Sequence, residues 1–118
     1  MSVSPISVIK KSPYEFKYLA YLRVEVQDLV MYYHMYERKN SSVYFKKPHI
    51  RQLDEETNLQ PIIRVFKKQG YDHLEEEIND AINKKIRSLA ETFESNFTIL
   101  YVNENDEIIT QENYHHHA

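Results

Sequence analysis

The chain has 118 residues, of which 42% are hydrophobic and 28% charged, and its formal net charge is −3. This length suits one domain with its own core, and the near-neutral charge provides no general attraction to nucleic acids or membranes. The absence of cysteine excludes disulfides, thiol nucleophiles and Cys-based zinc sites, and the single glycine, Gly70, excludes glycine-rich phosphate loops.

Residues 1–11 contain Pro5 and several β-branched residues. They are predicted to form either an edge strand at 6–9, where proline is tolerated, or an extended arm that packs only in part. Both alternatives stay open from the residues alone.

A long helix is predicted over 13–39. Ser12-Pro13-Tyr14-Glu15 combines a capping box with a proline at the first helical position. Apolar residues then recur at three- and four-residue spacing without an intervening glycine or proline, as in an amphipathic helix. Glu25 and Asp28 interrupt this pattern, and we expect them to form a narrow exposed face. The spaced apolar residues are Leu19, Leu22, Val26, Leu29, Tyr33 and Tyr36.

The middle of the chain contains weaker signals. Val43-Tyr44-Phe45 is either a short strand or an aromatic loop anchor, and Pro48 disfavours a helix at the residue before it. Asn58 can cap a short helix over 59–69, in which Pro61 falls in the first turn. Gly70 is then placed as the left-handed residue after that helix.

The C-terminal part predicts a second long helix over 73–96, with Asp72 as its cap and Ile78, Ile82 and Ile86 on its apolar stripe. A β-hairpin follows over 98–111. Residues 112–118, which include three terminal histidines, are expected to be a disordered tail or a purification remnant.

The predicted fold is therefore a helix-dominated α+β domain comprising all 118 residues. Its two long helices, 13–39 and 73–96, are expected to pack antiparallel, with the helix 59–69 between them in the chain. The hairpin 98–111 is expected to cover one side of the helices, either alone or in one sheet with the N-terminal strand.

The first functional hypothesis is a non-enzymatic interaction or assembly module. The apolar, Tyr-rich surface of the helix 13–39 exceeds what the other two helices can cover, so we expect a homodimer or a complex with another protein. The predicted interface residues are Leu22, Val26, Leu29, Tyr33, Tyr36 and Ile108.

The alternative is a small nucleic-acid-binding accessory protein that uses the basic-aromatic segment 37–51. Cations attract phosphates and aromatic rings stack on exposed bases, although the acidic residues at 54–56 next to this segment would repel a nucleic-acid backbone. A solvated loop whose aromatic residues fill the core would have the same composition. The candidate residues are Arg38, Lys39, Tyr44, Lys46, Lys47 and Arg51.

No catalytic, cofactor or metal site is predicted, and the chain is interpreted as a protein without enzymatic activity. His34, His49 and His73 lack metal-ligand spacing, and the acids at the start of 73–96 are explained by helix capping. The chain contains no apolar stretch of transmembrane length and no secretory signal, so a soluble cytoplasmic protein without membrane association is expected.

Overall fold

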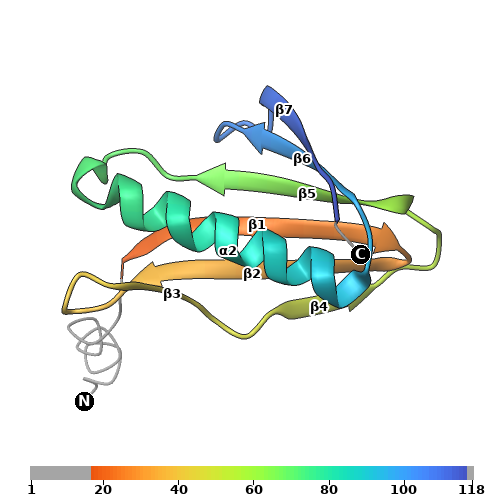
Figure 1. The fold of residues 1–118 in the computed structure, drawn as a ribbon, viewed down its shortest axis with the longest axis horizontal. Helices are drawn as coiled ribbons and strands as arrows, with labels where there is room; N and C mark the ends of the chain where they lie inside the picture. The colour runs from red at the N-terminus through yellow and green to blue at the C-terminus, as the bar shows by residue number, and fades with distance from the viewer. Residues whose placement is uncertain (1–16, 117–118) are drawn as a thin grey trace, which may run out of the picture.

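The computed structural model describes residues 17–116, which form a seven-stranded mixed sheet with a helix packed across one face (Figure 1). The predicted strand or arm within 1–11 lies outside the described residues. The elements are β1 (Tyr18–Gln27), β2 (Leu29–Glu37), β3 (Val43–Phe45), β4 (His49–Gln52), β5 (Asn58–Lys67), the 3₁₀ helix η2 (Asp72–Leu74), α2 (Glu75–Phe93), β6 (Phe97–Val102) and β7 (Ile108–Tyr114).

The strand order is β3-β2-β1-β5-β6-β7, with β4 also paired to β2. Among the strands of residues 17–116, only β5 and β6 run parallel, and α2 is the crossover between them, as a parallel pair requires a long connection. The other pairings are antiparallel. In Figure 1, α2 lies in front of β1 and β2, and the strands β6 and β7 lie on the far side of β5.

The predicted helix over 13–39 is wrong in the residues that the structure describes: they form β1 and β2, two paired antiparallel strands. The segment satisfies both periodicities, because Leu22 and Val26 fit a helical stripe while Leu22, Val24 and Val26 also alternate with polar residues. β-Branched and tyrosine side chains favour the strand, and pairing with β5 buries its alternate residues.

The turn between β1 and β2 has no glycine to mark it in the sequence. Val26 pairs with Leu29, so Gln27 and Asp28 alone form the connection. Gln27 adopts a φ of 53°, the left-handed conformation that such turns normally assign to glycine or asparagine. The signal that distinguishes a hairpin from a continuous helix is therefore missing from these residues.

The predicted helix over 59–69 is also wrong, because Asn58–Lys67 is the strand β5 between β1 and β6. Pro61 cannot donate a ladder hydrogen bond, and it falls between the paired residues Asn58 and Ile62, where the register with β1 shifts. Gly70 has the expected positive φ, 95°, but in the turn that follows a strand.

The helix predicted over 73–96 exists as α2, preceded by the 3₁₀ turn of η2, and no side chain caps it. It is the chain's single long helix among residues 17–116, so the helix-dominated fold class is wrong. The predicted hairpin exists as β6 and β7, and β7 continues to Tyr114, into the expected tail. Val43–Phe45 is a strand, the first of the two alternatives considered.

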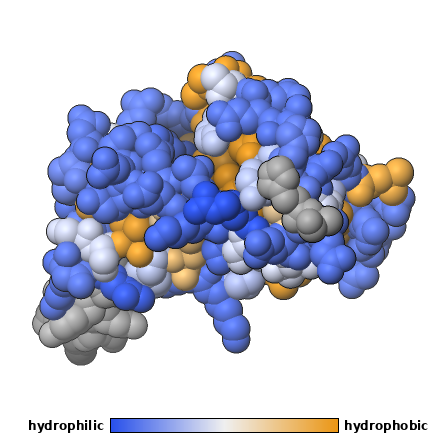
Figure 2. All heavy atoms as spheres, in the orientation of Figure 1, coloured by the Kyte–Doolittle hydropathy of each residue, from blue (hydrophilic) through white to orange (hydrophobic). Residues whose placement is uncertain are grey.

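The core lies between α2 and the sheet face that it covers. Ile78, Ile82 and Ile86 project from α2 at four-residue spacing, as the sequence predicts, onto Leu22 and Ile63 of the central strands. The outer surface of α2 is hydrophilic (Figure 2). Within residues 17–116, α2 does not combine the length and the apolar character that a membrane-crossing helix requires.

Candidate nucleic-acid interface

The sheet face opposite α2, here called the open face, is covered by no helix of residues 17–116. Side chains alternate between faces along a strand, so the neighbours of the core residues project onto it. Cross-strand pairing aligns these residues in rows: Tyr32, Arg23 and Arg64 form one row, and His34, Tyr21 and Phe66 form the next.

Aromatic rings from five strands lie against one another on the open face. The Tyr21 and Phe66 rings are stacked, with centroids 5.2 Å apart, and the His34 ring lies 5.8 Å from Tyr21. The Tyr32 and His34 rings are nearly parallel at 6.2 Å. The centroid distances in this network, 5.2 to 6.3 Å, are within the range of favourable aromatic pairs. The remaining rings of this network are Tyr18, Tyr36, Tyr44 and His49.

Two arginines lie among these rings, and a buried carboxylate holds them. Glu25 is 7% exposed, which corrects the expected exposed face at this position. Its Oε2 accepts a hydrogen bond from Arg64 Nε at 3.1 Å, and its Oε1 accepts one from Asn58 at 3.0 Å. The ion pair with two guanidinium groups compensates for the desolvation of the carboxylate.

Arg23 is held differently from Arg64. Its Nε lies 2.8 Å from Glu25 Oε2, but the N–H is not directed along a hydrogen bond to that oxygen. Its guanidinium carbon lies 5.6 Å from the centroid of the Tyr32 ring, within cation–π range. The side chain of Arg23 is about one third exposed, so its terminal N–H groups can reach a ligand on the open face.

A basic margin borders the aromatic rings on the β3 and β4 side. The Arg38 guanidinium lies 4.4 Å from the centroid of the Tyr44 ring, and Lys46 Nζ lies 4.6 Å from that of Tyr36. Arg51 pairs with Val30 in the row that contains Glu25, so it projects to the same face. These cations and Tyr44 belong to the basic-aromatic segment 37–51 that the sequence analysis predicted as a candidate nucleic-acid-binding segment. Lys39 and Lys47 are exposed in the turns beside this margin.

The environment of His34 favours its neutral form. Burial lowers the pKa of His34, and the nearby His49 and Lys46 lower it further. The Tyr18 hydroxyl lies 3.1 Å from His34 Nδ1. Burial raises the pKa of Tyr18, so its hydroxyl keeps its proton at neutral pH and can donate to a neutral imidazole.

A negative charge from the β6–β7 turn acts on the nearby side of the open face. Burial raises the pKa of Tyr21, and the charge of Asp106 in the β6–β7 turn raises it further. Cations are therefore concentrated at the centre and at the β3–β4 margin of the face. A polyanion would follow that half and avoid the turn near Asp106.

The predicted interface residues are divided by the sheet between separate surfaces. Leu22, Val26 and Tyr33 are buried in the core beneath α2, and Leu29 is half-buried at the β1–β2 turn. Tyr36 contributes to the open face, whereas Ile108 is 56% exposed at the start of β7. They do not form one surface.

Sequence reasoning missed the centre of the open face. The signal was a two-residue alternation: Tyr32, His34 and Tyr36 alternate with the core residues Met31, Tyr33 and Met35. The same alternation, together with the register shift between Tyr18 and Ala20, distributes the missed residues of β1 and β5. Those residues are Tyr18, Tyr21, Arg23, Arg64 and Phe66.

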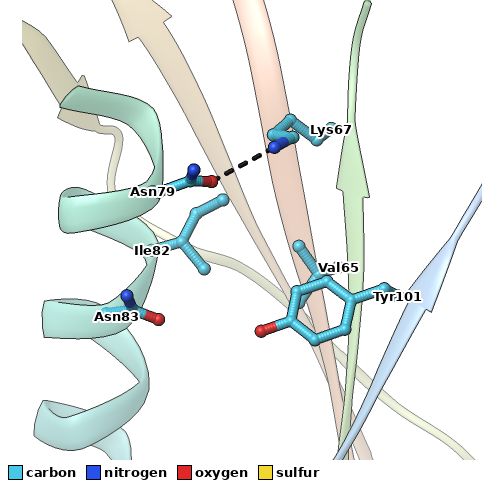
Figure 3. Close-up of a pocket in the computed structure, with 6 residues that line it drawn as sticks. All are labelled: Val65, Lys67, Asn79, Ile82, Asn83 and Tyr101. Carbon is cyan, nitrogen blue, oxygen red and sulfur yellow. Dashed lines mark hydrogen bonds between the residues drawn. The ribbon is translucent and has the colours of Figure 1, made fainter. Parts of the chain in front are cut away.

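A small cavity of about 200 Å³ lies on the other side of the sheet, between α2 and the strands β5 and β6 (Figure 3). Lys67 Nζ donates to Asn79 Oδ1 at 3.1 Å and is also paired with Glu75. Small-molecule sites typically occupy about 300–1,000 Å³. The cavity is smaller than that, and its one cation is already paired, so the open face is the stronger candidate site.

Among residues 17–116, no three histidine, aspartate or glutamate side chains converge as metal ligands. Comparisons with protein-family models, curated proteins and solved structures return no match to this chain. The function is therefore argued from the geometry of the open face.

Proposed function

We propose that the protein binds single-stranded nucleic acid on its open face, without catalysis. The observation that carries this proposal is the continuous network of aromatic rings on β1, β2 and β5, interspersed with Arg23 and Arg64. This is the alternative hypothesis from the sequence, extended from the segment 37–51 onto the sheet itself.

Stacking on exposed rings suits unpaired bases. Each base that stacks on an aromatic side chain contributes about 1–3 kcal/mol, and every base has an aromatic face, so this binding tolerates many sequences. Tyr21 and Tyr32 are half-buried, and each ring is held by neighbouring rings: Tyr21 by Phe66, and Tyr32 by His34. Rings that are already positioned lose little conformational entropy when a base binds.

The cations supply the contact with the phosphates. Arg23 and Arg64 stand in the middle of the rings, and Arg38, Lys46 and Arg51 line one margin. The net charge of −3 for the whole chain does not describe this face, since Glu75, Glu76 and Glu77 lie on α2. A locally positive face on an acidic protein favours binding in one orientation.

The test is fluorescence anisotropy at low salt with labelled oligouridylate and oligothymidylate. Arg64→Gln and Tyr32→Leu are expected to weaken binding about tenfold each, because they remove a phosphate contact and a stacking surface. Circular dichroism checks that each variant is folded.

Matched controls come from the other side of the molecule. Arg87→Gln on the outer surface of α2 removes the same charge as Arg64→Gln, and Tyr101→Leu removes a ring on the α2 side of β6. Both are expected to bind like the wild type. Absence of binding at low salt, or an equal loss in Arg87→Gln, would contradict the proposal.

The interaction-module hypothesis loses its predicted helical surface. Ile108 is its one nominated residue that is well exposed in the structure, and it lies beside Ile109, which is 64% exposed. Self-association at this strand is a separate proposal, argued next.

A further inference from the structure

We propose that two copies of the chain pair through β7, antiparallel and about a two-fold axis at Gln111, to join their sheets into one. This inference does not rest on nucleic-acid binding, because its evidence lies at the edge of the sheet.

β7 is an edge strand whose outer side has no neighbour among residues 17–116. Its residues from Ile108 to Asn113 are all exposed, and the strand is seven residues long. Alternate residues of an antiparallel edge direct their N–H and C=O groups outward, where another strand can accept them. Figure 1 shows β7 at the outer margin of the sheet, away from α2.

The two edges of the sheet differ in whether they carry residues that prevent another strand from pairing with them. Lys46, Lys47 and Pro48 interrupt the opposite edge between the short strands β3 and β4. Lysine and proline are the usual protection of an exposed edge. β7 contains neither, and its register with β6 is regular from Thr110 to Tyr114, with one irregularity before it. The structure therefore leaves β7 as the edge open to pairing.

The sequence of β7 is compatible with pairing to itself about Gln111. In that register Gln111 faces its own copy, and Glu112 faces Thr110 of the second copy. The strand's single charge, Glu112, thus avoids the like-charge pair that centring on it would create. Ile109, at the irregularity, falls opposite Asn113 and loses part of its exposure.

The symmetry of this pairing has a functional consequence. A two-fold axis perpendicular to the sheet reverses the strand direction but keeps each face on its own side. The two open faces would therefore lie on the same side of one continuous sheet, and both helices on the other. Only this consequence depends on the proposed function: a dimer would offer one long strand two binding faces.

The area involved predicts a weak dimer. A single seven-residue strand pair is at the low end of specific interfaces, which begin near 1,000 Å² in total. We expect the mass in sedimentation equilibrium to rise from 14.2 kDa toward twice that value between about 10 μM and about 1 mM protein. A constant monomer mass over this range, or growth beyond the dimer, overturns the proposal.

Cysteine cross-linking tests the register, since the chain has no native cysteine. Paired residues of antiparallel strands have Cα atoms about 4.5–5.5 Å apart, within disulfide range. Gln111→Cys is therefore expected to give a disulfide-linked dimer under mild oxidation. In the same register two copies of residue 113 lie about 13 Å apart, too far for a disulfide.

Asn113→Cys is thus the matched control, at another exposed position of the same strand. Cross-linking of both variants to the same extent indicates random collision and overturns the register. Cross-linking of Asn113→Cys alone overturns it as well. Loss of dimerisation leaves nucleic-acid binding by the monomer intact, so the two proposals fail separately.

Discussion

Glu25 shows how one buried charge organises the open face. It lies in the middle of β1 between two guanidinium groups, where an uncompensated carboxylate would be costly to bury. Its pairing aligns Arg23 and Arg64 on adjacent strands, with their exposed ends available to a polyanion. The same interaction therefore contributes to stability while neutralising part of the charge that binding would use.

Glu25→Gln is expected to change stability and binding in opposite directions. It should lower the free energy of unfolding by about 1–2 kcal/mol. This is less than the loss of a fully buried ion pair would cost, because solvent screens the two partly exposed arginines. It should also raise affinity for a single strand roughly fivefold at 0.1 M salt, the factor of one additional cation–phosphate contact. Urea unfolding and anisotropy measure the two effects.

Glu55→Gln, at an exposed position in the β4–β5 turn, is the control for the change of charge. It should leave the free energy of unfolding unchanged. A Glu25→Gln variant as stable as this control would contradict a structural role for the carboxylate.

His34 predicts a dependence of stability on pH. Because its pKa is lowered in the folded chain, the unfolded chain binds more protons as the pH falls. The stabilising contribution of neutral His34 is fully present above the unfolded pKa of about 6.5 and is lost as the pH falls toward the folded pKa. The free energy of unfolding of wild type should therefore decline faster below about pH 6.5 than that of His34→Gln.

Urea titrations at a series of pH values measure this difference. His73→Gln alters an exposed histidine beside α2 and should parallel the wild type over the whole series. If His34→Gln and wild type lose stability equally on acidification, burial of His34 does not determine the pH dependence.

At the scale of single elements, the β1–β2 connection explains the largest difference between prediction and structure. Val26 and Leu29 are paired across two residues, and Gln27 adopts the left-handed conformation without being glycine. The chain reverses there because both strands gain partners: β1 pairs with β5, and β2 with β3 and β4. Pairing and burial outweigh the local strain of about 1 kcal/mol at Gln27.

Gln27→Gly is expected to stabilise the protein by about 0.5 kcal/mol. Glycine removes the left-handed strain, and its larger unfolded entropy offsets part of that gain. Asp28→Gly is the matched comparison one residue later. Asp28 has a negative φ, so glycine relieves no strain there, and its carboxylate accepts a hydrogen bond from Gln52 Nε2 at 3.0 Å. Loss of this hydrogen bond in Asp28→Gly should destabilise the protein by about 0.5–1 kcal/mol.

Thermal and urea unfolding of the two variants are measured together. Opposite signs support the turn as described. Destabilisation by Gln27→Gly of the same size as that by Asp28→Gly would mean that Gln27 does not carry strain in the turn.

At the scale of the whole molecule, α2 divides the sheet into two environments. One face is a core of aliphatic side chains, and the other is an aromatic and basic surface. The separation explains how a chain of net charge −3 can gather cations on one face of its sheet. Most acids of α2 are kept on the side away from the open face.

Strand selectivity follows from this arrangement. A broad sheet offers rings to bases only when the bases are unstacked, so an unlabelled single strand should displace a bound oligonucleotide far better than a duplex of equal length. If at most five cations contact phosphates, a plot of the logarithm of the association constant against the logarithm of the salt concentration should have a slope no steeper than about −3.5. Competition assays measure the selectivity for single strands, and salt titration measures the slope. If the duplex competes as well as the single strand, binding depends on charge alone and not on stacking.

The apolar stripe of α2 and the alternation before and after the β6–β7 turn were sufficient to predict the long helix and the C-terminal hairpin. The basic-aromatic segment 37–51 was also recognisable, and it forms the margin of the candidate site. These features are local: a helix stripe repeats within a few turns, and a hairpin pairs neighbouring residues.

Only the tertiary structure decided that residues 18–37 are strands and that Tyr21, Tyr32, Arg23 and Arg64 share a face. In isolation, Leu22 and Val26 fit a helix and a strand equally well. The choice depends on partners distant in sequence: β1 pairs with residues 58–67, and Glu25 binds Arg64 from 39 positions away. Long-range pairing and burial thus determine both the fold and the proposed binding surface.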